Sequence, residues 1–208
     1  FESVGSDGAW QFFQEVELAG ELEDTPLRWN VGGYYLMENL SFESKTITRV
    51  LSAQATREYE QDTTSFALYA GFGWDFLDDF TLEGGVRYQW NRAGLDFELF
   101  AVGAVPPPFA GEEVWQAPTG GLALKYRFTE DATMYWKYTR GWKPGTWNTS
   151  TNVQRGANAA DPVTIDAWEA GLRGRGFDGR FAMGAAAFYY RYVDYQVFVV
   201  LSEPGTAP

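Results

Sequence analysis

The chain has 208 residues, a formal net charge of −12, and neither cysteine nor histidine. The missing residue types exclude a disulfide framework, a thiol nucleophile, a Ser-His-Asp triad and a zinc site built from Cys or His. The acidity argues against nucleic acid as a partner, because phosphate binding needs a basic surface. Aromatic residues make up 18% of the sequence and glycine occurs 23 times, a composition that favours an all-β protein.

Alternating apolar and polar residues, the pattern of a β-strand, recur along the chain. The alternation is clear over 27–37, 65–76, 80–90, 119–128 and 132–140, and weaker over 10–20 and 163–174. In FTLEGGVRYQW, residues 80–90, every even position is apolar or glycine, and the odd positions include Glu83 and Arg87. A further strand is expected over 180–200, where the pattern does not assign the two faces and a bulge would fit. The pattern predicts about eight strands in all.

The expected connections alternate in length. Short turns rich in Asp, Glu, Gly or Pro are expected at 21–26, 77–79, 129–131 and 175–179, and long connections at roughly 38–63, 91–118 and 141–162. Connections of the longer kind are uncommon in compact soluble domains. Outer-membrane barrels, in contrast, have short periplasmic turns and long extracellular loops. The alternation therefore favours an antiparallel up-and-down transmembrane β-barrel, with its apolar face toward lipid and its charged face toward the lumen.

Two absences bear on how such a chain would reach a membrane. The first residues, FESVGSDGAW, have neither the basic region nor the apolar stretch of a signal peptide, and no run of 18 apolar residues occurs. We therefore expect strands to make any membrane crossing, and the targeting segment to have been removed or to lie outside this sequence. Aromatic residues near the expected strand ends, among them Trp29, Trp74, Trp90 and Tyr138, fit the girdles of a barrel wall.

Motifs in the second half of the chain carry a family resemblance. Residues 135–148 read YWKYTRGWKPGTWN, and residues 165–198 contain EAGLR, FDGR and AFYYRYVDYQ in that order. The matching positions are Tyr138, Arg140, Gly141, Lys143, Gly145, Asn148, Glu169, Gly171 and Arg173, followed by 177–180 and 189–196. With residues 12–38, which read like an earlier hairpin of the same family, these motifs resemble the barrel of TonB-dependent outer-membrane receptors over nearly the whole chain.

The resemblance implies a transporter in the outer membrane of a Gram-negative bacterium, with no enzymatic activity and no cofactor. Such receptors import a scarce, bulky solute, for example a siderophore–iron complex, cobalamin or a glycan, and TonB drives the import through a plug domain. The implied partners are outer-membrane lipid, TonB and a small-molecule solute such as an iron chelate.

The resemblance also implies a domain assignment. The family's barrel has about 22 strands, so residues 1–208 are expected to be an internal part of the barrel domain. The plug and the C-terminal strands are expected to lie outside this sequence, because no plug sequence precedes Phe1 and the last residues, SEPGTAP, read as the start of a loop.

Two sets of candidate site residues follow. Charged residues on the polar face of the expected strands are predicted to line the lumen, most of them paired across strands or with a plug. They are Glu83, Arg87, Lys125, Arg127, Lys137, Glu169 and Arg173. Loop residues are candidates for solute contact, because exposed aromatic rings can stack on a ligand. They are Trp142, Lys143, Trp147, Asn148 and Trp115, and for Trp142 a place in an interfacial girdle is the alternative.

Two other interpretations remain open on the sequence. Eight strands can close a small outer-membrane barrel with a structural or adhesion role, although such a barrel should finish on a strand. A soluble all-β carbohydrate-binding or glycosidase domain would use carboxylates and aromatic side chains. The candidate carboxylate pairs, Glu112 with Glu113 and Asp78 with Asp79, fall in expected loops and turns, which is typical of solvated residues.

Overall fold

The computed structural model of the chain describes residues 2–48, 53–101, 107–149, 158–177 and 180–197. These ranges form ten β-strands and contain no helix, and therefore no helix that could cross a membrane. The strands are β1 (Glu2–Leu22), β2 (Thr25–Thr48), β3 (Ala53–Leu77), β4 (Phe80–Ala101), β5 (Phe109–Thr129), β6 (Ala132–Lys143), β7 (Thr146–Asn148), β8 (Asn158–Ala160), β9 (Val163–Gly176) and β10 (Phe181–Val193).

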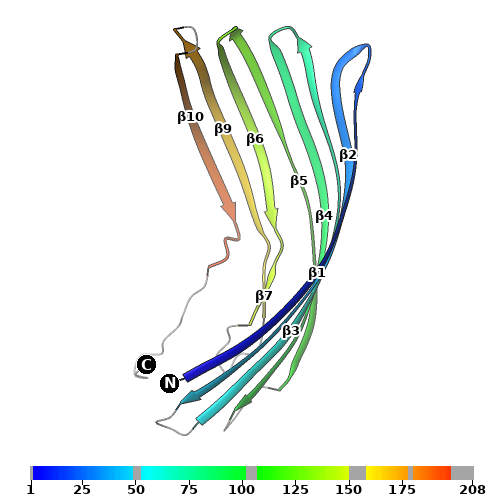
Figure 1. Cartoon of the computed structure of the whole chain (residues 1–208), viewed down its shortest axis with the longest axis vertical. Helices are drawn as coiled ribbons and strands as arrows, with labels where there is room; N and C mark the ends of the chain where they lie inside the picture. The colour runs from blue at the N-terminus through cyan, green and yellow to red at the C-terminus, as the bar shows by residue number, and fades with distance from the viewer. Residues whose placement is uncertain (1, 49–52, 102–106, 150–157, 178–179, 198–208) are drawn as a thin grey trace.

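Eight of the strands form one curved antiparallel sheet (Figure 1). Its order is β1-β2-β3-β4-β5-β6-β9-β10, so consecutive strands are neighbours except where the small hairpin of β7 and β8 is inserted. The expected all-β, up-and-down antiparallel fold is confirmed. Within the described residues β1 and β10 are the two edges and do not pair with each other, so the sheet is not a small closed barrel of eight strands.

The short connections lie together at one end of the sheet, which we call the short-turn end; the opposite end is the far end (Figure 1). The strand register shifts beside three of these turns, between Glu21 and Leu22, between Asp75 and Leu77, and between Arg127 and Thr129. The β9–β10 pairing continues through Val193 without a shift, so the bulge considered for 180–200 does not occur there. Residues 198–200 lie outside the described ranges.

Two of the expected long connections are mostly strand, so their predicted bounds are wrong. β2 continues to Thr48 and β3 begins at Ala53, which turns most of 38–63 into paired backbone. β4 ends at Ala101 and β5 begins at Phe109, which shortens the expected connection 91–118 in the same way. The third connection contains the β7–β8 hairpin.

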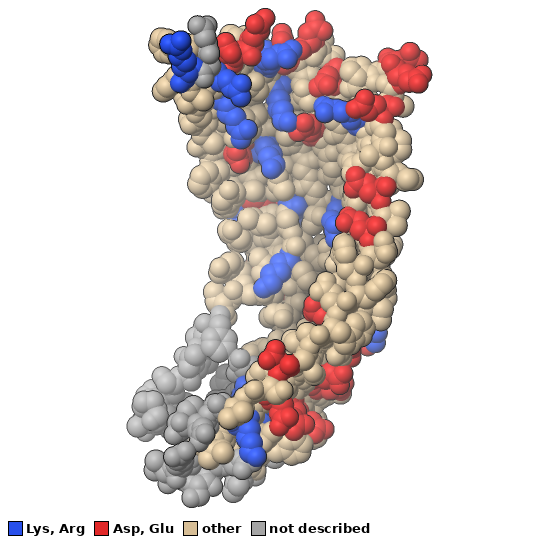
Figure 2. Space-filling model, in the orientation of Figure 1, with Lys and Arg blue, Asp and Glu red and all other residues tan. Residues whose placement is uncertain are grey.

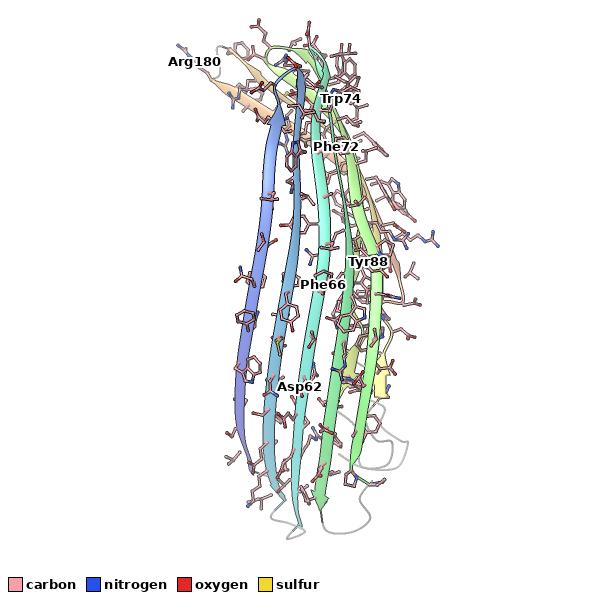
Figure 3. All side chains as sticks on the ribbon, turned by 90° about the vertical axis from the view of Figure 1, so that its right-hand side faces the viewer. Asp62, Phe66, Phe72, Trp74, Tyr88 and Arg180 are labelled. Atoms are coloured by element: carbon pink, nitrogen blue, oxygen red, sulfur yellow. The ribbon has the colours of Figure 1, made fainter. Side chains whose placement is uncertain are left out.

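The two faces of the sheet differ in character, and we name them after one residue of each, the Phe66 face and the Glu83 face. Toward the short-turn end the Phe66 face is apolar and exposed; Val86, for example, keeps 68% of its surface accessible. Figure 3 shows this face, and below the label of Arg180 its labelled side chains follow one another from the short-turn end as Trp74, Phe72, Tyr88, Phe66 and Asp62. The appearance of Asp62 marks a change, because the same face becomes polar toward the far end.

The faces exchange character along each long strand, as β4 shows. Its Phe66 face is apolar up to Trp90 and then carries Asp96 and Glu98, both exposed. Its Glu83 face changes in the opposite sense, and Leu95 and Phe97 on it are each only 2% exposed. The period of two is kept, but its phase reverses after Trp90. No face of β4 is apolar along the whole strand. A strand with one constant apolar face is therefore not recognised beyond Trp90, and the sequence pattern indicates a loop there.

Glycines opposite aromatic residues fit neighbouring strands together. The register places Gly20 opposite Trp29, Gly84 opposite Phe72, Gly32 opposite Tyr69 and Gly171 opposite Tyr135. A Cβ atom at Gly84 would lie 2.7 Å from the Phe72 ring, and one at Gly20 would lie 2.9 Å from the Trp29 ring. The rings therefore occupy the space that a side chain at the glycine would need, an arrangement known to fix register in β-sheets.

Aromatic side chains gather at two levels of the Phe66 face. Near the short-turn end, the rings of Phe80 and Tyr126 stack with their centroids 4.4 Å apart. Further along β6, β9 and β10, Trp168 lies between Tyr138 and Tyr189, with centroid separations of 5.4 and 5.6 Å. Two aromatic levels separated by apolar residues are the pattern that the girdles of a barrel wall would give.

Candidate functional site

The β7–β8 hairpin covers part of the Glu83 face at the far end of the sheet (Figure 1). Trp147 of β7 packs with three residues of β4 in a buried apolar cluster: Ala93, Leu95 and Phe97. Partly buried residues surround the cluster: Tyr59, Leu99, Phe109, Trp115 and Ala159. The cluster explains the reversal of the β4 pattern, because the apolar residues at this end meet the hairpin.

Trp147 is the centre of this contact. Its side chain is 8% exposed, and its indole nitrogen donates a hydrogen bond to the backbone oxygen of Ala93 over 3.0 Å. Its ring meets that of Phe109 edge to face, with centroids 5.4 Å apart and an interplanar angle of 64°. The sequence suggests an exposed loop aromatic at this position, but only the pairing of strands far apart in the chain could reveal its burial.

The other candidates for solute contact are distributed over both faces. Trp115 lies on the Glu83 face beside the cluster of Trp147. Trp142 lies opposite Thr164 on the Phe66 face. Lys143 is exposed, and its amino group donates to the side-chain oxygen of Gln196 over 2.7 Å. Asn148, in β7, lies with its side-chain nitrogen 3.5 Å from the side-chain oxygen of Asn158. The structure thus brings Trp115 and Trp147 together and places Trp142 apart from them.

All seven charged residues expected to line a lumen lie on the Glu83 face, as the strand register shows. They are Glu83, Arg87, Lys125, Arg127, Lys137, Glu169 and Arg173. Lys125 forms an ion pair with Glu83, with 2.6 Å between Nζ and Oε1. Tyr135 donates its hydroxyl hydrogen to Glu169 over 2.5 Å, and the guanidinium of Arg173 lies 5.4 Å from the Tyr135 ring centroid.

Charged side chains crowd the short-turn end of the molecule (Figure 2). There Arg127 donates to the backbone oxygen of Asp78 over 2.7 Å and pairs with the Asp79 carboxylate at 3.4 Å. Arg28 pairs with Asp75 at 3.5 Å. The pair Asp78 and Asp79, considered as catalytic carboxylates, is thus engaged in holding the turn between β3 and β4.

One polar group on the Glu83 face was not found from the sequence. The Tyr69 hydroxyl of β3 lies 2.7 Å from a Glu15 carboxylate oxygen and 2.8 Å from a Glu17 carboxylate oxygen, both on β1. The ring crosses β2 at Gly32, which lies opposite it. No short-range sequence signal connects residues this far apart, so only the register identifies the group.

At the far end the Phe66 face is strongly acidic. Its exposed carboxylates are Glu43, Glu58, Glu60, Asp62, Asp96, Glu98 and Glu112. Asn39 donates to Glu60 over 2.7 Å and to Asp62 over 2.9 Å. Arg92 pairs with Glu112, and this hydrogen bond lowers the pKa of the Glu112 carboxyl below its ordinary value. Among the described residues, no three carboxylates are grouped closely enough to hold a metal ion.

Comparison with known proteins identifies a family over almost the entire chain. Residues 4–208 match the family described as TonB dependent receptor-like, beta-barrel. The pesticin receptor of Yersinia pestis is 25% identical over 214 aligned residues, covering 91% of this chain and 31% of that protein. The chain thus spans about a third of the length of the curated relatives it matches.

Solved structures share the fold. The crystal structure of the ferric yersiniabactin uptake receptor FyuA from Yersinia pestis superposes with a TM-score of 0.79 at 21% identity, covering 94% of this chain and 30% of that one. The siderophore receptor PiuA from Acinetobacter baumannii superposes with a TM-score of 0.71 at 15% identity, covering 88% of this chain and 32% of that one.

Proposed function

The chain belongs to the family of TonB-dependent receptor β-barrels, which are outer-membrane proteins of Gram-negative bacteria and not enzymes, and we propose that its protein imports a ferric siderophore by energy-coupled transport. The observation that carries the proposal is the alignment of 91% of the chain with the pesticin receptor. The names of the structural relatives FyuA and PiuA, a ferric yersiniabactin uptake receptor and a siderophore receptor, support the same solute class. Energy coupling is inferred from the family.

The exchange of faces supports this role. The apolar part of the Phe66 face has the composition of a barrel wall, so we assign it to lipid contact, and the Glu83 face to the lumen. The short-turn end is then periplasmic and the far end extracellular. Beyond the lipid the outer surface becomes acidic, while the inner surface becomes apolar and packs against the β7–β8 hairpin. The far end of the sheet thus forms part of a mouth above the membrane.

The domain arrangement is part of the proposal. β1 and β10 are edge strands whose unpaired backbone groups lipid would not tolerate. We therefore assign residues 1–208 to an internal part of a barrel of about 22 strands, with a plug domain elsewhere in the protein that contacts TonB. Mass spectrometry of the native protein in outer-membrane fractions tests this arrangement. A mature chain of 208 residues would contradict it, and plug peptides upstream of Phe1 would support it.

The proposed solute contacts lie around the hairpin at the mouth. Lys143 offers an exposed cationic group on the Glu83 face, and Asn148 offers an amide in β7. Trp115 and Trp147 pack in and against the buried cluster on the wall. Their rings therefore support the binding surface from below, and we do not assign them to direct solute contact. Trp142, on the opposite face, fits an interfacial position better. Of the seven charged residues assigned to the lumen wall, Lys125 pairs with Glu83 and Arg127 pairs with Asp79. Arg87, Glu169 and Arg173 contact neighbouring polar or aromatic side chains.

Uptake of radioactive iron tests the proposed function. A strain lacking the gene for the full-length protein is grown under iron limitation and supplied with labelled ferric yersiniabactin, a labelled ferric catecholate or labelled ferric citrate. Restoring the gene should restore uptake of at least one chelate. Copper is the control, because the copper transporter OprC shares the fold with a TM-score of 0.63. Restored copper uptake without any iron uptake would contradict the proposal.

The proposed contacts have a test of their own in the same strain. Lys143→Ala, and separately Asn148→Ala, should reduce uptake of the transported chelate without lowering the amount of receptor in the outer membrane. Unchanged uptake in both variants would remove these residues from the proposed solute contacts.

A further inference from the structure

The β7–β8 hairpin is attached to the inner side of the wall more firmly than a mobile surface loop would be. Its single tryptophan contributes an edge-to-face aromatic contact and a buried hydrogen bond to a backbone oxygen of β4. Ala159 of β8, directly opposite Trp147 in the hairpin, packs against the same cluster. Both short strands of the hairpin therefore contact the wall.

Two glycines show how closely the hairpin fits. A Cβ atom at Gly111 of β5 would lie 2.6 Å from the Phe109 ring and 2.8 Å from the Trp147 ring. A Cβ atom at Gly145, directly before β7, would meet the Trp115 ring. Neither position has room for a methyl group while the hairpin is docked. Glycine at both positions is therefore a requirement of the docked arrangement, since such close packing tolerates no added methyl.

The electrostatics of the contact agree with permanent docking. The indole N–H is buried, and leaving it without an acceptor would cost free energy. Its acceptor is a backbone oxygen, which neither pH nor a side-chain rotation can remove. None of the described residues that form the cluster is charged.

We propose that Trp147 is the positioning residue of the mouth: it holds the β7–β8 hairpin against the inner wall, so that the hairpin is a fixed part of the solute-binding surface. A fixed hairpin presents Asn148 and the end of β6 to a solute at a constant place. This effect on solute binding rests on the proposed function. Trp147 thus affects the affinity for the solute indirectly, by keeping the hairpin in position. Direct contact of the indole with the solute is not needed.

A cysteine at Ala159 reports the docking, because residues 1–208 contain no cysteine of their own. The full-length receptor without the substitution gives the background labelling, which is subtracted. The full-length receptor carrying Ala159→Cys is produced in cells, and the rate of its reaction with a membrane-impermeant maleimide is measured. The reaction should be slow in this background. Adding Trp147→Phe, which removes the hydrogen bond, should raise the rate about tenfold. Adding Trp147→Ala should raise it at least about a hundredfold.

Gly111→Ala provides an independent way to displace the hairpin without changing Trp147, and it should raise the labelling rate about tenfold or more. Gly94→Ala is the matched control, because a Cβ atom at Gly94 meets nothing within 4 Å. It should leave the rate unchanged. Equal rates in all variants would overturn the proposal, as would fast labelling in the Ala159→Cys background alone.

The solute readout separates this proposal from the proposed function. Surface binding of the transported ferric chelate to de-energised cells should weaken in Trp147→Ala and in Gly111→Ala, and remain unchanged in Gly94→Ala. If no ferric chelate is bound or taken up even by the wild-type receptor, the proposed function fails while the labelling result still decides the docking. Unchanged affinity in variants whose hairpin is shown to be released would contradict the positioning role.

Discussion

Tyr69 lies directly opposite Gly32, and its ring occupies the space above that glycine to bring its hydroxyl within 2.8 Å of carboxylates on β1. Three strands are joined by this one side chain, because it starts on β3, crosses β2 and reaches Glu15 and Glu17. The same relationship between a glycine and an aromatic ring recurs at Gly171 and Tyr135, where the hydroxyl reaches Glu169. Glycine in the sheet thus lets polar aromatic side chains lie flat along the Glu83 face.

Substitution of Gly32 by alanine should destabilise the sheet by about 1–3 kcal/mol, because the added methyl overlaps the Tyr69 ring and must displace it from both carboxylates. Thermal unfolding of the full-length receptor in detergent measures the change. Gly94→Ala, a glycine in a strand with open space around its Cβ position, is the control and should unfold like the wild type. Equal losses in the two variants would contradict the fitted role of Gly32.

An arginine at Leu68 should reduce membrane insertion, because this residue is 57% exposed on the part of the Phe66 face assigned to lipid. The expected cost is about 2–4 kcal/mol for a cation near the centre of the bilayer. Glu98→Arg lies on the same face beyond the apolar part and should insert normally. Folding yield into lipid vesicles, compared between the two variants, gives the result. A normal yield for Leu68→Arg would refute the assignment of this face to lipid.

The Lys125–Glu83 pair should contribute less than about 1 kcal/mol to stability despite its 2.6 Å distance, because both side chains keep about 40% of their surface exposed. A double-mutant cycle with Glu83→Gln and Lys125→Met, followed by thermal unfolding, isolates the coupling between them. A coupling well above this value would show that the pair is shielded from water in the full-length receptor.

The Arg92–Glu112 pair should make stability depend on pH in a predictable sense. Since the folded state lowers the pKa of Glu112, the contribution is present above the carboxyl's ordinary pKa and is lost as pH falls through the lowered value. The unfolding temperature of the wild type should therefore exceed that of Glu112→Gln at neutral pH, and the difference should shrink below about pH 4. A difference independent of pH would contradict the pairing. The difference in unfolding temperature between the wild type and Glu112→Gln should be small, because both side chains of the pair are about half exposed.

Alternation in the sequence predicted the eight strands of the sheet and the common face of the seven charged residues. These features depend only on the period of a strand, which a local window records. The full lengths of β2, β3, β4 and β5 could not be predicted from the sequence. The apolar side changes from the Phe66 face to the Glu83 face near Trp90 and at the neighbouring positions of the adjacent strands. A pattern that reverses its phase resembles a loop when each face is expected to keep one character.

The environment of Trp147 also lay beyond the sequence. GWKPGTWN reads as a loop rich in aromatic residues, and its composition does not distinguish a ring offered to a ligand from one buried against a wall. The residues that contact the buried Trp147 ring, Ala93 and Phe109, are more than thirty residues away from it in the chain. The family motif identified the segment, and the register of the sheet supplied its geometry.

The energy dependence of uptake is the most direct test of whether the receptor imports a ferric chelate by energy-coupled transport. Cells producing the full-length receptor are given the labelled ferric chelate that it transports, with and without a protonophore, and bound and internalised iron are measured separately. Surface binding should persist with the protonophore while internal accumulation stops, because TonB can no longer act on the receptor. Accumulation that continues unchanged after the proton gradient is abolished would contradict energy-coupled import.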